Sequence, residues 1–373
     1  MRETIENDKG DSHVNVVDVR RLESASEHIV TSGQGYFPVI ATTQTDDLLV
    51  VLRGGSGHIG LGGRLDAVRS TDGGRTWTQP TTIADSERDD RNPALGLTAD
   101  GVAILGYHWQ GSYDESGQWE PKRGPADTRV IRSTDGGVTW GEDLKLNWLP
   151  LNGTSPFGKI RRDNEGTLYM PVYSGSYPLG VGAGTQKVDP ATCPTYLLRS
   201  NDGGDTWRDP LTVAVGLNEA DLLIISPNDW LFAGRSENQE DQAIYTLRST
   251  DRGHTWSQPE RVTDGKEHPP DLTLLSNGAV LMTYGRRHPS FGVEGRISLD
   301  RGRTWQENTI ILASDLPGTD IGYPSTARLS DGTLVTVYYR AGTKETPNDG
   351  YNALDVSCIA VRYSESDLLA AIR

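Results

Sequence analysis

Cysteine and long apolar segments are both scarce in this chain. Its 373 residues include only two cysteines, Cys193 and Cys358. Two cysteines this far apart give neither a disulfide framework nor a metal-binding spacing. We therefore expect two reduced thiols, no metal and no other cofactor. No apolar run approaches the ~20 residues that a membrane-spanning helix requires, so no transmembrane segment is expected.

Positive charge is also in deficit, because 36 Lys and Arg face 51 Asp and Glu and leave a net charge of −15. A nucleic-acid surface needs a basic stripe, and anionic membranes attract basic segments. Neither is therefore expected as a partner. The first ten residues are charged and lack the apolar core of a signal peptide. The sequence predicts a cytoplasmic protein with a flexible segment over residues 1–10, and it gives no oligomeric state.

Glycine is abundant, and one pattern, S-x-D-x-G-x-T-W, occurs five times. The copies start at Ser70, Ser133, Ser200, Ser249 and Ser298 and end at Trp77, Trp140, Trp207, Trp256 and Trp305. The Asp can accept backbone N–H bonds inside a turn, and the Gly permits a positive φ. The Trp is large enough to pack against neighbouring strands. We interpret the copies as structural β-hairpin turns rather than as metal or catalytic sites.

This pattern is the Asp-box, and over nearly its whole length the chain resembles the sialidase superfamily. The resemblance implies a six-bladed β-propeller. Six pairs of apolar runs, each broken by a turn such as Asp100-Gly101, agree with it. Each pair, with the two strands around an Asp-box, makes one four-stranded antiparallel blade. We predict a single all-β domain over residues 11–373.

The sixth blade has no Asp-box, so its outer half needs another source. We expect its third strand over residues 353–362. Its outer strand is expected to come from the N-terminus, over residues 14–19, where apolar residues dominate. Such a strand closes the ring and covers an edge that is otherwise open to pairing.

Strand direction predicts which residues surround the mouth of the central channel. First strands start, and second strands end, on the face away from the Asp-boxes. The residues at these points include Tyr36, Asn92, Ser155, Glu219, Asp271 and Tyr323, then Arg53, His108, Tyr173, Arg235, Arg286 or Arg287, and Arg340. Four blades place an Arg at the same structural point. Because converging guanidinium groups bind carboxylates, the ring predicts an anion-binding site.

The resemblance also implies roles for individual residues. Sialidases hold the substrate carboxylate with three arginines, use a Tyr–Glu pair as nucleophile and an Asp as acid/base. Glu219 and Arg235 look like the glutamate and one arginine, and Tyr323 resembles the tyrosine. The third arginine is Arg286, Arg287 or Arg296, of which we favour Arg287. A phenol with a pKa near 10 becomes a nucleophile when a carboxylate can take its proton.

Two positions depart from the sialidase pattern. Where sialidases carry R-I-P, this chain reads Tyr36-Phe37-Pro38, so a tyrosine replaces the first arginine. The acid/base Asp is expected in the loop over residues 54–63, which contains His58 and no carboxylate. These departures argue against a strict sialic acid hydrolase.

The leading hypothesis is a glycoside hydrolase that cleaves a bond next to an anionic sugar of the sialic acid or uronate type. Glu219 and Tyr323 form the nucleophile or base unit, and His58, His108 or Asp90 is the general acid. The predicted substrate-binding residues are Tyr36, Arg53, Arg91, Asn92, Tyr173, Arg235, Asp271, Arg286, Arg287 and Arg340. A polysaccharide lyase acting on uronates is the alternative, because β-elimination needs only a neutralised carboxylate, a base and an acid. A non-catalytic glycan-binding propeller is the third hypothesis.

Overall fold

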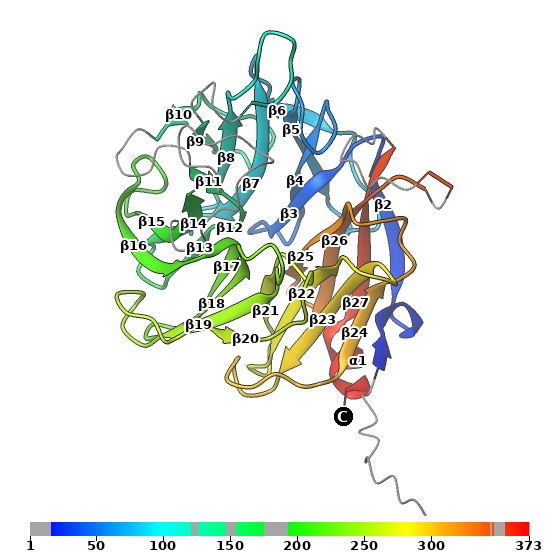
Figure 1. The fold of residues 1–373 in the computed structure, drawn as a ribbon. Coiled ribbons are helices and arrows are strands. Elements are labelled where there is room, and N and C mark those ends of the chain that lie inside the picture. The colour runs from blue at the N-terminus through cyan, green and yellow to red at the C-terminus, as the bar shows by residue number, and fades with distance from the viewer. Residues whose placement is uncertain are drawn as a thin grey trace, which may run out of the picture.

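The computed structural model describes residues 16–120, 126–146, 154–174, 193–343, 345–346 and 355–372. Across these ranges almost all regular structure is β-strand, gathered into six sheets that surround a central axis (Figure 1). The predicted all-β, six-bladed propeller is thereby confirmed. Within the same ranges, no helix is both long and apolar enough to cross a membrane.

The blades follow one another along the chain, each running from the axis outwards. Blade 1 contains β3 (Tyr36–Thr42), β4 (Leu48–Gly54), β5 (Arg64–Ser70) and β6 (Thr81–Ala84), and blade 2 contains β7 (Asp89–Leu97), β8 (Ala103–Gln110), β9 (Ala126–Ser133) and β10 (Leu144–Lys145). Blade 4 contains β17 (Leu217–Ser226), β18 (Asp229–Ser236), β19 (Ile244–Ser249) and β20 (Glu260–Arg261), and blade 5 contains β21 (Asp271–Leu274), β22 (Val280–Arg286), β23 (Gly292–Ser298) and β24 (Thr309–Ala313). Blade 6 contains β25 (Ile321–Arg328), β26 (Thr333–Ala341) and β27 (Val356–Ser364), and the helix α1 (Glu365–Ala371) follows it.

Blade 3 departs from this regularity at its inner strand. Here β11 (Thr154–Pro156) and β13 (Arg161–Arg162) pair with β14 (Leu168–Ser174), which continues outwards to β15 (Pro194–Ser200) and β16 (Arg208–Val215). Between them, β12 (Gly158–Lys159) pairs in parallel with β7 of blade 2. The interrupted strand places the Lys159 side chain between blades near the axis.

The core lies between the blades rather than inside any one of them. One buried apolar cluster fills each of the six interfaces between neighbouring blades. Strand β4 shows the cause, because its side chains point alternately to two faces and both faces are covered. Leu48 and Val50 pack towards blade 6, whereas Leu49 and Val51 pack towards blade 2. A seventh cluster, mostly aromatic, lies at the channel mouth described below.

The Asp-box turns have the structural role that their residues predict. In the first copy, Asp72 accepts hydrogen bonds from the backbone N–H groups of Arg75, at 3.0 Å, and Thr76, at 2.9 Å. Burial opposes ionisation of Asp72, but hydrogen bonds, chiefly from Thr76, lower its pKa below the ordinary value. Gly74 has a φ of 87°, and its N–H donates to the Ser70 hydroxyl at 2.8 Å. Each turn is thus held by its own polar side chains.

Trp207 is expected to contribute strongly to stability because only 3% of its surface is exposed, in the interface between blades 2 and 3. Replacing Trp207 with Ala should lower the free energy of unfolding by about 3–5 kcal/mol. Urea denaturation measures this, with Trp77→Ala as the control, since Trp77 is only partly buried. Loss of function in a Trp207→Ala protein of unchanged stability would contradict the structural role.

The prediction for the N-terminal strand is wrong in its residues. Strand β1 (Val16–Asp18) pairs in parallel with β24 of blade 5, and β2 (Ser26–Ser32) closes blade 6 against β27. Residues 14 and 15 lie outside the described ranges. The 3-10 helix η1 (Val19–Arg21), capped by Asp18, redirects the chain between the two strands. The apolar pattern of residues 16–19 therefore reflects packing on blade 5, while β2 closes the ring with a more polar sequence.

Candidate active site

Four inner strands begin with a bulge at the channel mouth. The pairing register shifts between Tyr36 and Val39, Arg91 and Ala94, Leu217 and Ala220, and Gly322 and Ser325. Within three of these bulges a non-glycine residue has a positive φ, namely Phe37 at 53°, Asn92 at 49° and Tyr323 at 49°. Bulges redirect side chains, and such backbone conformations persist only where the surroundings hold them.

Glu219, Tyr323 and Arg235 form one buried hydrogen-bonded unit. The Tyr323 phenol donates to Glu219 Oε1, and Arg235 Nη1 donates to Glu219 Oε2 at 2.8 Å. The guanidinium carbon of Arg287 lies 5.0 Å from the centroid of the Tyr323 ring. Blades 4, 5 and 6 thus bring together the four residues that the sialidase resemblance singled out.

The electrostatics of this unit assign the proton to Tyr323. Burial favours the neutral form of Glu219, but the charge of Arg235, hydrogen bonds from Tyr323 and Arg235, and the charge of Arg287 lower its pKa. Burial and the Glu219 charge raise the pKa of Tyr323 well above 10 despite the two arginines. Glu219 is therefore an ionised acceptor facing a neutral phenol, the arrangement that a base-activated nucleophile requires.

His58 is paired with a carboxylate that the sequence analysis did not identify. Its Nδ1 lies 2.8 Å from Asp320 Oδ1, and the Tyr339 phenol donates to the same oxygen at 2.7 Å. Tyr36 also hydrogen bonds to Asp320, and burial together with the Asp320 charge raises its pKa. Burial disfavours ionisation of Asp320, but hydrogen bonds from His58 and Tyr339 lower its pKa. Because an ionised carboxylate only accepts hydrogen bonds, His58 carries a proton on Nδ1.

Burial lowers the pKa of His58, although Asp320 opposes the shift. The ring is therefore neutral at pH 7 in the free protein. Asp320 lies at the mouth end of β25, only three residues before Tyr323, so strand position could have revealed it. It was missed because the family pattern directs attention to a carboxylate in the blade 1 loop.

Phe37 lies between the two chemical groups of the site. Its ring centroid is 4.7 Å from that of His58 and 4.9 Å from that of Tyr323. The guanidinium carbon of Arg91 lies 5.5 Å from the centroid of the Phe37 ring. The surrounding aromatic cluster contains Tyr36, Phe37, Phe157, Tyr173, Tyr323 and Tyr339. No sequence motif assigns a role to Phe37 or Phe157.

The interpretation of Arg53 as a substrate ligand is wrong. Its side chain is fully buried and donates to the Asp89 carboxylate, to the Asp90 carbonyl oxygen at 2.9 Å and to the Gly57 carbonyl oxygen at 2.9 Å. These bonds brace the loop that carries His58. Arg53 is thus a supporting residue, and the missed Asp89 is its partner.

Neither of the other two candidate acids contacts the Glu219–Tyr323 pair. Asp90 is buried and accepts from the backbone N–H and the hydroxyl of Ser86, at 2.6 and 3.1 Å. The His108 Nδ1 lies 3.1 Å from the Thr154 carbonyl oxygen, and burial together with Arg91 lowers its pKa to about 4. Of the three predicted acids, His58 is the one whose ring packs against Phe37, which in turn packs against Tyr323.

Asn92 links two blades at the rim, because its amide donates to the Ser155 hydroxyl at 2.9 Å and to the Tyr173 phenol at 3.1 Å. The remaining predicted ligands lie elsewhere. Asp271 pairs with Lys159 at 2.5 Å, deeper in the channel. Arg286 donates outwards to the Ser290 and Pro289 carbonyl oxygens, at 2.7 and 3.1 Å. Arg340 is exposed because Tyr339, its neighbour on β26, takes the inward position.

His268 is a further buried residue that no sequence motif marks. It is 2% exposed, and its Nδ1 has no hydrogen-bond partner among the described residues. Burial and the charges of Arg235 and Arg287 lower its pKa well below 6.5. The site therefore contains a neutral imidazole beside two guanidinium groups. Within the described ranges, no group of three or more His, Cys, Asp or Glu side chains could hold a metal ion.

Comparison with known proteins agrees with the propeller fold. Residues 64–336 match the family described as the BNR repeat-like domain. A sialidase of Micromonospora viridifaciens is 33% identical over 123 residues, which are 31% of this chain and only 18% of that protein. The chain therefore aligns with much less than two thirds of its curated relative.

Solved structures share the fold at low sequence identity. A protein of unknown function from Dyadobacter fermentans has a TM-score of 0.73 and 22% identity, with 92% of this chain and 99% of that one covered. The NanB sialidase of Streptococcus pneumoniae has a TM-score of 0.69 and 12% identity, with 91% and 69% covered. A Trypanosoma rangeli sialidase, solved with sialic acid, has a TM-score of 0.60 and 13% identity, with 94% and 58% covered. The chain belongs to the BNR repeat-like domain family and is a sialidase-like six-bladed propeller.

Proposed function

We propose that the chain is a glycosidase that cleaves the bond between an anionic sugar and its neighbour at the channel mouth. The observation that carries the proposal is the buried Tyr323–Glu219–Arg235 unit with Arg287 over the Tyr323 ring. A carbohydrate ligand also agrees with the sialic acid named in the Trypanosoma rangeli structure.

In the proposed reaction, Tyr323 Oη attacks the anomeric carbon while Glu219 takes the phenolic proton. A neutral phenol suits a substrate with a carboxylate near that carbon, because an anionic nucleophile would be repelled by it. Arg235 and Arg287 bind the substrate carboxylate through charge-assisted hydrogen bonds. Protonated His58 donates a proton to the leaving oxygen, and Asp320 orients its ring and stabilises the imidazolium form. In the second step the neutral His58 takes a proton from a water that attacks the anomeric carbon, the bond to Tyr323 Oη breaks, and Glu219 returns the proton to the phenol.

A sugar panel tests the proposal. Aryl glycosides of a sialic acid, a uronic acid and the neutral sugar matched to the uronic acid would be incubated with the protein, and products identified by mass spectrometry. Release of the sugar from one or both acidic glycosides, but not from the neutral one, supports the proposal. Binding of acidic sugars without any turnover would instead support the non-catalytic glycan-binding propeller.

The neutral state of His58 favours a polysaccharide lyase as the second candidate. An unprotonated imidazole held by Asp320 can remove the proton next to a uronate carboxylate that Arg235 and Arg287 neutralise. The product of such an elimination contains a new C=C bond and absorbs in the near ultraviolet. If incubation of a uronate polymer with the protein produced this absorbance, the protein would be a lyase and not a hydrolase.

The proposed hydrolase should work best at acidic pH. Glu219 must be ionised, and its pKa lies below 4.5; His58 must be protonated, and its pKa lies below 6.5. The pH dependence of kcat/KM reflects the pKa values of the free enzyme. The value of kcat/KM should therefore fall as pH rises through the pKa of His58, and at acidic pH it should stay high until the pH approaches the pKa of Glu219. A maximum above pH 7 in a profile of kcat/KM would contradict the role of His58 as acid.

Arg235 is expected to affect acidic substrates most. Its Nη1 binds Glu219, while its buried Nε has no partner among the described residues. The two substrates to compare are an acidic glycoside and an analogue in which an uncharged amide replaces the carboxylate. Arg235→Ala should lower kcat/KM for the acidic glycoside at least about tenfold more than for the amide. The reason is the loss of one charge-assisted interaction, which is worth about 1.5–3 kcal/mol. Equal losses on both substrates would show that Arg235 acts only through Glu219.

A further inference from the structure

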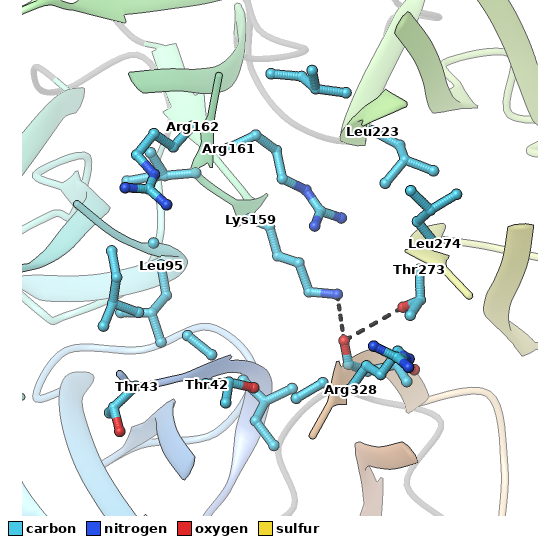
Figure 2. Close-up of a pocket in the computed structure, with 18 of the residues that line it drawn as sticks. Thr42, Thr43, Leu95, Lys159, Arg161, Arg162, Leu223, Thr273, Leu274 and Arg328 are labelled. Carbon is cyan, nitrogen blue, oxygen red and sulfur yellow. Dashed lines mark hydrogen bonds between the residues drawn. The ribbon is translucent and has the colours of Figure 1, made fainter. Parts of the chain in front are cut away.

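The other end of the channel, nearest to the Asp-boxes, opens into a cavity of about 490 Å3. Its wall is made by the last residues of the inner strands of all six blades, from Ile40 in blade 1 to Arg328 in blade 6 (Figure 2). The starts of the same strands carry Tyr323 and Glu219. The cavity is therefore separate from the candidate active site.

The lining of this cavity carries charge of one sign. Four of the described lining residues are basic, namely Lys159, Arg161, Arg162 and Arg328, and none is Asp or Glu. In a chain with a net charge of −15, this is a local concentration of positive charge. Charged linings of one sign raise the local concentration of counter-ions.

Two of these cations are held in place by carboxylates that lie behind the wall. Lys159 Nζ lies 2.5 Å from Asp271 and donates to the Thr326 carbonyl oxygen at 2.7 Å. Arg161 donates to both oxygens of Asp221, from Nε at 3.1 Å and from Nη2 at 2.6 Å. Asp221 and Asp271 are buried. The two cations are therefore fixed in orientation before any ligand arrives.

These ion pairs leave hydrogen-bond donors unused. An ammonium group has three N–H donors and a guanidinium has five. Two contacts engage Lys159, and Arg161 Nη1 takes part in no hydrogen bond among the described residues. Figure 2 shows Lys159 and Arg161 extending into the middle of the ring, with Arg162 at its edge.

Arg162 is the basic residue of this wall that forms no ion pair among the described residues, although its charge also acts on the exposed carboxyl group of Asp100. It is exposed on β13 and has no hydrogen bond or ion pair within the described ranges. Arg328, by contrast, donates through Nε to Glu365 at 2.5 Å. Leu95, Leu223 and Leu274 form apolar parts of the wall.

We propose that this cavity is a second binding site, for a small multivalent oxyanion that carries carboxylate or phosphate groups. One anionic group lies between Arg161 and Lys159, where the orientation of the donors is fixed, and another pairs with Arg162 at the rim. The carboxylates behind the wall keep Lys159 and Arg161 in place, whereas Arg162, which forms no ion pair in the described part of the chain, is free to turn towards a ligand at the rim.

Isothermal titration calorimetry at constant ionic strength tests the site, with inorganic phosphate and citrate as separate probes. One of them should bind saturably with one-to-one stoichiometry, and the probe that does so shows whether phosphate or carboxylate is the ligand chemistry. Arg162→Ala should weaken that binding at least about tenfold, because a charge-assisted interaction is lost. The matched control is Arg208→Ala, which removes the same charge from an exposed position on β16, the outer strand of the same blade.

A second variant separates this site from the candidate active site, where citrate could bind Arg235 and Arg287. Arg235→Ala should leave the affinity measured at the Asp-box end unchanged. The proposal is overturned if neither anion binds saturably. It is equally overturned if Arg208→Ala weakens binding as much as Arg162→Ala, or if Arg235→Ala abolishes binding while Arg162→Ala does not.

Discussion

Tyr323→Phe is expected to lower kcat by roughly a thousandfold or more, because the substitution removes the oxygen proposed to attack the anomeric carbon. The ring and its contacts with Phe37 and Arg287 are kept. Glu219 remains bound to Arg235, so the loss of one hydrogen bond should cost only about 1–3 kcal/mol of stability. Turnover of the best acidic glycoside, together with a thermal melt, measures both effects.

The matched control for this variant is Tyr169→Phe, which removes a buried phenolic oxygen that donates to Asp163 instead of Glu219, at the end of β14 away from the channel mouth. It should retain most of the turnover. If the two variants lost activity equally, Tyr323 would be no more than an aromatic filling of the channel.

Asp320→Asn is expected to lower kcat about 10²–10⁴-fold, as removal of acid–base catalysis does. The amide keeps the shape of the carboxylate, but it no longer holds the negative charge that stabilises a protonated His58. The alkaline limb of the pH profile should move to lower pH, because Asp320 raises the pKa of His58 against burial.

His58→Ala is the companion variant, and its activity should lose the alkaline limb altogether. A substrate with a good leaving group, such as a nitrophenol, should suffer much less, since its departure needs little protonation. An unchanged pH profile in Asp320→Asn, or equal losses with good and poor leaving groups in His58→Ala, would exclude this pair as the acid.

The fold could be predicted because its signals are local and repeated. Each Asp-box contains within eight residues the Ser, Asp, Gly and Trp that hold its turn, so five copies locate five blades. The closing strand was assigned to the wrong residues because β2 is exposed on one face and has a polar sequence, which does not indicate a strand that completes a blade. Residues 16–19 are apolar because they pack on blade 5.

The site was predicted in part. Glu219 and Arg235 share one hairpin, and strand order brings Tyr323 to them, so their meeting follows from the repeat. Arg53 has the same position on its hairpin as Arg235. Its guanidinium group, however, forms a buried ion pair with Asp89 on the next blade and therefore does not face the channel mouth. The pairing of His58 with Asp320 joins residues 262 positions apart, and no local pattern reports such a contact. Neighbouring side chains on a strand point to opposite faces. Since Tyr339 faces the channel mouth, this alternation alone would have excluded Arg340 from the predicted substrate ligands.

The most direct test of the central claim is to look for a covalent bond to Tyr323. The protein would be incubated with a glycosyl fluoride of the preferred acidic sugar, with a second fluorine next to the anomeric carbon to slow breakdown of the adduct. Intact-protein and peptide mass spectrometry should then find the sugar attached to the peptide that contains Tyr323, and no attachment in Tyr323→Phe. An unmodified protein that turns over acidic glycosides, or an adduct on another residue, would contradict the assignment of Tyr323 as the nucleophile.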